Sequence, residues 1–199
     1  MTARGHFIAF EGWEASGKST QAELLAARIG AVLTREPGGT ELGRLVRAML
    51  LGDGPVPTSR AEALLFAADR AQHTDEVVEP TLRAGRHVVT DRSYGSTLAY
   101  QGHGRGQSVE QLMALVDFAT AGILPDLIVL LDVPLDMADV RLGGERDRLE
   151  SEAAEFGQRV RDGFFQLAGA DPDRWVIVDG VGDVDDVAAR VWETYEGWR

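Results

Sequence analysis

The stretch Gly12-Trp13-Glu14-Ala15-Ser16-Gly17-Lys18-Ser19 decides the fold class of this chain. It fits the pattern Gly-x-x-x-x-Gly-Lys-Ser/Thr and stands between an apolar run, Phe7 to Phe10, and an amphipathic stretch that begins at Lys18. A strand, a loop and a helix in this order form the setting in which the motif binds nucleotide phosphates. Its glycines let backbone N–H groups surround a phosphate, and the helix N-terminus adds donors and a positive dipole end.

Lys18 is the only lysine of the chain, and every other residue of the 20 Lys+Arg total is arginine. A compact ammonium and a planar guanidinium are not interchangeable at a tight phosphate site. The motif places Lys18 on the β- and γ-phosphates and the Ser19 hydroxyl on Mg²⁺. The sequence therefore predicts a site for a nucleoside triphosphate with its magnesium ion. The alternative is a chance glycine-rich turn that binds nothing.

The composition of the 199 residues is that of a globular protein, with 44% hydrophobic and 26% charged residues. A formal net charge of −12 gives no broad positive field for a nucleic-acid backbone, so we expect no nucleic-acid partner. Cysteine is absent, which excludes disulfides, cysteine-ligated zinc and thiol catalysis. Asparagine is also absent, which excludes the Asn-Lys-x-Asp motif that reads guanine.

The sequence carries no sign of a membrane segment. No stretch approaches the ~18 apolar residues of a membrane span. Met1 to Phe10 lacks the long apolar core of a signal peptide. We therefore expect a cytoplasmic protein with no membrane partner.

Short apolar runs alternate with longer amphipathic stretches along the chain. The apolar runs are Phe7 to Phe10, Ala31 to Leu33, His87 to Asp91, Leu127 to Leu131 and Trp175 to Asp179. The amphipathic stretches cover residues 18–29, 41–51, 59–84, 109–121, 135–142, 150–168 and 184–198, and Pro80 predicts a kink or break in the third. Runs that are apolar on both faces suit a parallel sheet covered by helices. We expect an α/β fold with a five-stranded parallel sheet and helices on both faces, formed by residues 1–199 as one domain.

Asp91 and Arg92 end the third predicted strand. Ligands of open parallel sheets bind beyond the carboxyl ends of the strands, so Asp91 is expected to face the nucleotide. There it would hold Mg²⁺ directly or through water, and the Arg92 guanidinium would bind a phosphate with two donors. The alternative is a surface ion pair at a strand end.

Three further sets of residues favour a second binding site, each with a structural alternative. The segment Arg35–Thr40 forms a rigid bend with bare backbone beside it, or an ordinary turn. Phe66 and Arg70 share a helix face and can clasp a base, or they are core and surface residues. Thr97 and the segment Tyr100–Gly102 can read a pyrimidine edge or a sugar, or they form an exposed helix end.

Taken together, these segments resemble the thymidylate kinase family over essentially the whole chain. The resemblance rests on Phe-Glu-Gly-x-Glu-x-x-Gly-Lys-Ser-Thr (10–20), Arg-Glu-Pro-Gly-Gly-Thr (35–40), Leu-Phe-Ala-Ala-Asp-Arg (65–70), Asp-Arg-Ser (91–93), Ser-Thr-Leu-Ala-Tyr-Gln-Gly (96–102) and Asp-Arg-Leu-Glu (147–150). It implies the P-loop nucleoside monophosphate kinase fold with a short lid. It also implies ATP-dependent phosphorylation of dTMP to dTDP in dTTP biosynthesis, by a homodimer.

The resemblance also implies roles for individual residues. Phe66 stacks on thymine and Arg70 hydrogen-bonds the base, while Arg92 holds the dTMP phosphate. Glu14 lies near the deoxyribose 3′-hydroxyl and the acceptor phosphate. The implied dTMP site comprises Glu14, Glu36, Pro37, Phe66, Arg70, Arg92, Ser96, Thr97, Tyr100 and Gln101. The implied ATP site comprises Gly12, Trp13, Glu14, Ala15, Ser16, Gly17, Lys18, Ser19, Thr20 and Arg141, with Ser19 and Asp91 for Mg²⁺.

The residue at position 15 sorts subtypes of the family. Some members carry an arginine at the position of Ala15, and those that lack it resemble the bacterial subtype, in which a mobile lid supplies arginines. We expect that lid at approximately residues 141–153, with Arg146 and Arg148 joining Lys18, Arg92 and Glu14 in catalysis. The alternative is a solvated run of charged residues. Arg141 would lie against the adenine.

Two other functions remain open at this point. One is a kinase for another nucleoside monophosphate or small substrate. The other is a nucleotide-dependent switch without catalysis, although the missing guanine-reading motif speaks against a GTPase.

Overall fold

Five strands form one parallel sheet in the order β2-β3-β1-β4-β5 in the computed structural model, which describes residues 4–142 and 154–199. The strands are β1 (Phe7–Glu11), β2 (Val32–Arg35), β3 (Val88–Asp91), β4 (Leu127–Asp132) and β5 (Trp175–Asp179). They confirm the five predicted runs, with β2 continuing to Arg35 because Thr34 pairs with Thr90 and Arg35 with Asp91. The expected α/β class and parallel sheet are therefore confirmed.

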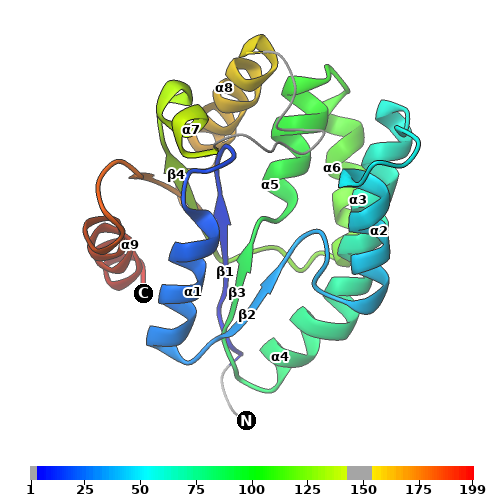
Figure 1. Cartoon of the computed structure of the whole chain (residues 1–199). Helices are drawn as coiled ribbons and strands as arrows, with labels where there is room; N and C mark the ends of the chain where they lie inside the picture. The colour runs from blue at the N-terminus through cyan, green and yellow to red at the C-terminus, as the bar shows by residue number, and fades with distance from the viewer. Residues whose placement is uncertain (1–3, 143–153) are drawn as a thin grey trace.

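Helices cover both faces of this sheet (Figure 1). One face carries α1 (Lys18–Ile29) and α9 (Val184–Trp198), which pack on each other. The other carries α3 (Ser59–His73), α6 (Val109–Thr120) and α8 (Ala154–Ala170), with α2 (Glu41–Leu51) against α3. A short helix, α7 (Leu135–Leu142), follows β4. This arrangement leaves the carboxyl ends of the strands together at one edge of the sheet.

Alternate residues of the central strands contribute to two separate cores. Ile8 and Phe10 of β1 belong to the core under α1 and α9, whereas Ala9 belongs to the core under α6 and α8. In β4, Val129 faces the first core and Ile128 faces the second. Burial on both faces explains why these strands read as continuous apolar runs.

The third amphipathic stretch is helical from Ser59 to Arg83, but its middle is widened. After α3, the segment η1 (Thr74–Val78) is π-helical, and α4 (Glu79–Arg83) follows it directly. Pro80 lacks an N–H donor, and its ring would clash with the carbonyl four residues earlier in a regular helix. The wider π-turn just before Pro80 accommodates it, so the predicted kink is present as a change of helix type.

Residues 94–104 are helical, although they lie outside the amphipathic stretches from which the helices were predicted. The structure has a short helix α5 (Tyr94–Thr97) that continues into the π-helical segment η2 (Leu98–Gly104). Gly104 marks a close approach to α8, because a Cβ there would lie 2.6 Å from Phe156 Cε2. The polar residues and glycines of this segment disrupt the apolar periodicity by which most helices are recognised.

No helix within residues 4–142 and 154–199 has both the length and the hydropathy needed to cross a membrane.

Candidate active site

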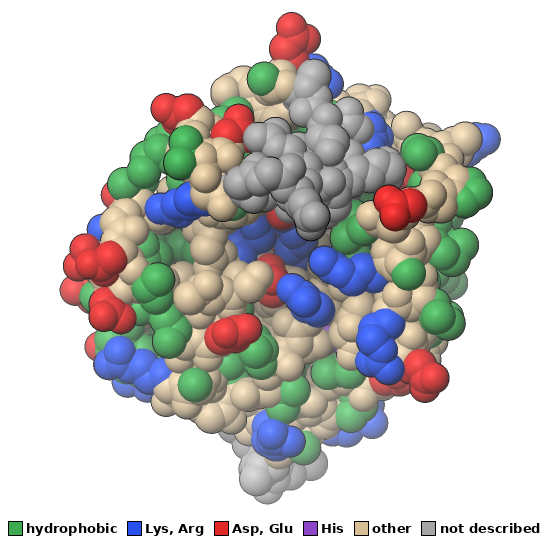
Figure 2. All heavy atoms as spheres, viewed as in Figure 1, with side chains coloured by type: hydrophobic (Ala, Val, Ile, Leu, Met, Phe, Trp, Pro, Cys, Tyr) green, Lys and Arg blue, Asp and Glu red, His purple; other side chains and the backbone are tan. Residues whose placement is uncertain are grey.

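A cavity of about 450 Å³ opens where β1, β2 and β3 end. In the space-filling view, Lys and Arg side chains gather in a hollow near the middle of this face (Figure 2). Every predicted site residue within the described ranges lines the cavity except Gly12, Trp13 and Ser16. The fold thus brings the two predicted sites, the phosphate loop and the second binding site, into one space.

The phosphate loop between β1 and α1 depends on unusual backbone angles. Gly12, Ala15 and Gly17 have φ values of 143°, 53° and 93°. A Cβ on Gly12 would lie 2.5 Å from Leu131 O, so only glycine fits there. Lys18 Nζ crosses the loop and donates to Trp13 O at 2.6 Å. Burial, together with the positive charge of Arg92, lowers the pKa of Lys18 to about 8.

Three predicted loop residues stay out of the cavity lining for different reasons. Gly12 and Ser16 form the inner wall of the loop, where Ser16 is buried. The Trp13 ring is buried and stacks on Tyr100 at 5.6 Å between ring centroids. Trp13 therefore contributes its carbonyl oxygen to the loop, and its side chain belongs to the core.

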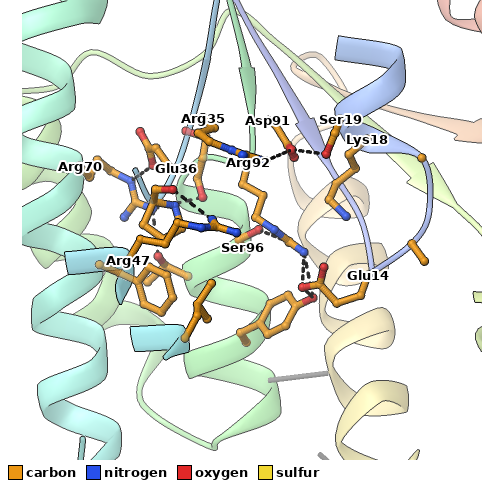
Figure 3. Close-up of a pocket in the computed structure, with 18 of the residues that line it drawn as sticks. Glu14, Lys18, Ser19, Arg35, Glu36, Arg47, Arg70, Asp91, Arg92 and Ser96 are labelled. Carbon is orange, nitrogen blue, oxygen red and sulfur yellow. Dashed lines mark hydrogen bonds and ion pairs between the residues drawn. The ribbon is translucent and has the colours of Figure 1, made fainter. Parts of the chain in front are cut away.

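Ser19 and Asp91 face each other across the gap between α1 and β3. Ser19 Oγ donates to Asp91 Oδ2 at 2.5 Å, and Arg35 Nη2 lies 3.4 Å from the same oxygen (Figure 3). Asp91 Oδ1 is buried and has no hydrogen-bond partner among the described residues. Burial opposes ionisation, but the charges of Lys18 and Arg92 hold the pKa of Asp91 below its usual range.

Ser19 Oγ and the Asp91 carboxylate suit a magnesium ion whose other ligands are phosphate oxygens of the substrate and water. No cluster of three or more His, Asp or Glu side chains that could hold a metal occurs in residues 4–142 and 154–199. Mg²⁺ usually takes one or two protein oxygens and completes its shell with phosphates and water. The Ser19 hydroxyl and Asp91 Oδ1, which has no hydrogen-bond partner in the part of the chain that the structure describes, therefore fit the ion.

Arg92 sits at the centre of the site (Figure 3). Its φ of 73° turns the side chain back over the loop, where Nη1 donates to Ser96 Oγ at 2.9 Å. Nη2 forms an ion pair with Glu14, and Tyr100 Oη donates to the same carboxylate oxygen at 3.1 Å. Although burial acts against ionisation, the charges of Arg92 and Lys18 lower the pKa of Glu14 to about 2.

Beneath Arg92, the buried carboxylate of Glu11 holds the turn after β3. It accepts hydrogen bonds from Ser93 N at 3.0 Å, Ser96 N at 2.9 Å and Ser96 Oγ at 2.5 Å. Burial raises the pKa of Glu11 to about 7, and these hydrogen bonds and Arg92 only partly oppose the shift. The sequence analysis assigned no role to Glu11, which ends β1, because its partners Ser93 and Ser96 come from a segment 82 to 85 residues further along the chain.

On the other side of the cavity, α3 presents Phe66 and Arg70. Arg70 Nε donates to Glu36 Oε2 at 2.8 Å, and Nη2 donates to Thr97 Oγ1 at 3.1 Å. Arg70 Nη1 is buried without a partner among the described residues, and Arg70 lines the cavity. Glu36 Oε1 also forms a hydrogen bond with His73 Nδ1 at 2.8 Å, which holds the Glu36 carboxylate in place. One donor of Arg70 thus remains for a ligand beside the Phe66 ring.

Arg141 reaches the phosphate loop from α7. Its Nη1 lies 3.4 Å from Ala15 O and its Nη2 lies 3.3 Å from Gly180 O. Arg146 and Arg148, and most of the expected lid at 141–153, lie outside the described residues.

The cavity also contains residues that the sequence did not predict. Arg35, Arg47, Leu51 and Ser93 all line it. Arg47 Nη1 donates to Pro37 O at 3.1 Å, which ties α2 to the bend after β2. Arg35 is the first residue of the motif Arg-Glu-Pro-Gly-Gly-Thr at 35–40, whereas nothing in the spacing of residues along α2 distinguishes Arg47 from its neighbours.

A phosphate loop at one end of a cavity and an arginine-lined pocket at the other define a P-loop kinase that acts on a small phosphorylated substrate. The thymidylate kinase family model matches residues 10–191. The chain belongs to the thymidylate kinase family. It is 48% identical over 201 aligned residues to the thymidylate kinase of Carboxydothermus hydrogenoformans, covering 98% of each chain. It is 43% identical to that of Bifidobacterium longum, covering 94% of this chain and 95% of the relative.

A solved structure agrees with this assignment. The crystal structure of thymidylate kinase from Ehrlichia chaffeensis matches with a TM-score of 0.82 and 33% sequence identity. The match covers 96% of this chain and 99% of the other. The expected P-loop nucleoside monophosphate kinase fold is thereby confirmed.

Proposed function

We propose that the two substrates of this kinase meet in the 450 Å³ cavity, with the donor at the phosphate loop and the acceptor beside α3. The reaction is the ATP-dependent phosphorylation of dTMP to dTDP, which is the reaction of the family. One observation carries the proposal: Lys18 of the phosphate loop and Arg92, a second phosphate-binding group, line the same cavity.

The donor end is the loop from Gly12 to Thr20. Its backbone N–H groups and the start of α1 hold the phosphates of ATP, and Lys18 neutralises charge at the β- and γ-phosphates. Ser19 and Asp91 would hold Mg²⁺, which when bound would supply further positive charge to these phosphates. Arg141, whose Nη1 lies 3.4 Å from Ala15 O, would lie against the adenine of ATP.

The acceptor end lies between α3, α5 and the bend after β2. Arg92 and Arg47 supply cations for the dTMP phosphate, and Phe66 stacks on the base. Arg70 Nη1, which has no hydrogen-bond partner within residues 4–142 and 154–199, donates to a carbonyl oxygen of thymine. The walls of this end are completed by Glu36, Pro37, Ser96, Thr97, Tyr100 and Gln101.

The chemistry needs positioning and charge more than proton transfer. The attacking oxygen belongs to a phosphate and is already anionic, so no general base is required. Arg92, held by Glu14 and Ser96, keeps this oxygen in line with the γ-phosphoryl group. Glu14, ionised at neutral pH, accepts a hydrogen bond from the deoxyribose 3′-hydroxyl. Arg146 and Arg148 would add positive charge to the transferred phosphoryl group. Both would belong to a lid at residues 141–153. The lid would be part of a single domain that spans residues 1–199.

We also propose that the chain is a homodimer through α2, α3 and α6. These helices pack side by side and expose large apolar side chains on their outer faces. Leu45 and Met49 of α2 are 63% and 58% exposed, Leu64 of α3 is 54% exposed and Phe118 of α6 is 86% exposed. Isolated exposed apolar residues are ordinary, but a set on three adjacent helices suits a self-complementary interface.

The test of the acceptor is an ADP-release assay with ATP, Mg²⁺ and a panel of dTMP, dUMP, dCMP, dGMP and AMP. We expect dTMP to have the highest kcat/KM and dTDP to form in step with ADP. Preferred turnover of another monophosphate would favour the kinase for a different substrate. Nucleotide binding with no turnover of any acceptor would favour the switch.

A further inference from the structure

We propose that Glu62 and Arg105 lock the side-chain amide of Gln101 so that its carbonyl oxygen faces the nucleobase. The lock makes Gln101 an acceptor, which selects bases that carry an N–H on their pairing edge and rejects cytosine. The inference rests on the proposed function, in which dTMP occupies the acceptor end of the cavity. Glu62 and Arg105 are positioning residues, since neither lines the cavity.

The lock is a buried carboxylate that accepts hydrogen bonds from the side chains of Gln101 and Arg105. Glu62 of α3 is 0% exposed, and its Oε1 accepts Gln101 Nε2 at 2.8 Å. Arg105 Nε donates to the same oxygen at 2.8 Å, and Arg105 Nη2 donates to Oε2 at 3.3 Å. A carboxylate paired with a guanidinium can only accept hydrogen bonds. The Gln101 amide must therefore turn its NH₂ toward Glu62, whichever substrate is bound.

The carbonyl oxygen of the Gln101 amide is left for the ligand. Gln101 lines the cavity, and no hydrogen bond reaches its Oε1 within the described part of the chain. Gln101 is only 1% exposed, but its Oε1 is not closed off completely, so the small surface that the residue keeps in the cavity includes this oxygen. An amide is planar, and its oxygen lies on the side away from the nitrogen that Glu62 holds.

The same face of α3 adds a donor next to this acceptor. Glu62, Phe66 and Arg70 are spaced by four residues, so all three lie along one face of the helix. Phe66 lines the cavity between the lock and Arg70, whose Nη1 has no partner among the described residues. The acceptor of Gln101 and the donor of Arg70 therefore flank the ring on which the base would stack.

A donor and an acceptor side by side fit only some bases. Thymine and uracil offer a carbonyl oxygen and the adjacent N3–H, which complement Arg70 and Gln101. Cytosine offers an amino group and an unprotonated N3, which opposes both side chains. A site built to hydrogen-bond one pattern strongly rejects a ligand that leaves its buried polar groups unpaired.

The test is Glu62→Gln, which keeps the shape but can donate as well as accept, so that the Gln101 amide is free to reverse. We expect the ratio of kcat/KM for dTMP to that for dCMP to fall about ten-fold or more. The fall should come mainly through KM for the nucleotide acceptor, with KM for ATP unchanged. The dTMP to dUMP ratio should stay within about two-fold, because both bases carry N3–H. Glu79→Gln, which removes an exposed carboxylate paired with Arg83, is the matched control and should leave all ratios unchanged.

Arg105→Met is the second variant, because Arg105 is partly exposed and its loss is less disruptive to folding. It should shift the dTMP to dCMP ratio in the same direction. If both variants fold and keep the wild-type ratio, or if they lose dTMP and dCMP turnover equally, the lock is wrong and Glu62 is structural. Failure of the wild-type enzyme to phosphorylate dTMP would instead overturn the proposed function.

Discussion

The carboxylate of Glu14 and the guanidinium of Arg92 form an ion pair that joins the phosphate loop to the end of β3. Tyr100 Oη donates to the same Glu14 oxygen at 3.1 Å, and the Tyr100 ring packs on Trp13 in the core. The donor end and the acceptor end of the cavity are therefore tied together by one charged contact. A shift of the phosphate loop on binding ATP would therefore move Arg92, the arginine that is proposed to hold dTMP.

Lys18→Met should abolish turnover and leave the fold intact. The buried ammonium supplies positive charge that the phosphates meet as the bond to the γ-phosphoryl group breaks. Lys18→Arg should fail as well, because Nζ lies only 2.6 Å from Trp13 O and the loop has no room for a planar guanidinium. Steady-state kinetics and thermal unfolding of both variants test this. A kcat near the wild-type value in the arginine variant would contradict it.

Phe66→Ala should raise KM for dTMP more than it lowers kcat. Phe66 lines the cavity and is only partly buried against the core, so its ring has a face left for the base. Stacking of a base on an aromatic side chain is worth about 1–3 kcal/mol. A ring that served the core alone would instead cost about 3–5 kcal/mol of folding stability when removed. Unchanged dTMP affinity with a collapsed melting temperature would rule out the stacking role.

Glu11→Gln should change how stability depends on pH. The folded-state pKa of Glu11 is about 7 against an ordinary value of 4.5, so folding favours the protonated form. The stability that this proton confers is fully present below pH 4.5 and is lost as the pH rises through 7. Relative to Glu11→Gln, the wild type should lose roughly 1 kcal/mol per pH unit across this window.

Urea unfolding of the wild type and Glu11→Gln, at about pH 5.5 and about pH 8, measures this difference. Comparison of the two proteins at each pH cancels the contributions of the other titrating groups. A gap in unfolding free energy that is the same at both pH values would show that Glu11 does not titrate in this range.

Phe118→Glu should dissociate the proposed dimer. Phe118 is 86% exposed on α6, so the substitution places a charge on the outer face without disturbing the core of the subunit. Sedimentation equilibrium should give a dimer for the wild type and a monomer for the variant, with the same melting behaviour at low concentration. A wild type that sediments as a monomer would remove the basis for this interface.

Prediction from the sequence succeeded in those parts of the site where one short segment carries the whole signal. The phosphate loop needs glycines at fixed positions and a lysine, and the end of β3 needs Asp91 and Arg92. Both parts of the site could therefore be recognised in the sequence. Glu11 and Glu62 were not, because their partners come from α5 and η2, far away in the chain. Arg47 joins the site only because α2 folds back over the bend at Pro37.

The helix from Tyr94 to Gly104 escaped prediction for a related reason. Its glycines and polar side chains serve contacts with α8 and the cavity, and these contacts override the local pattern. The roles of Arg146 and Arg148 stay predictions, since they lie outside the described residues.

The most direct test of the central claim is a crystal structure with dTMP and a non-hydrolysable ATP analogue bound together. We predict the triphosphate on the loop with its terminal phosphates at Lys18, and the dTMP phosphate within hydrogen-bond distance of Arg92. The thymine ring should lie against Phe66 with N3–H toward Gln101 Oε1. A dTMP molecule bound outside this cavity, or with its phosphate away from Arg92, would contradict the account.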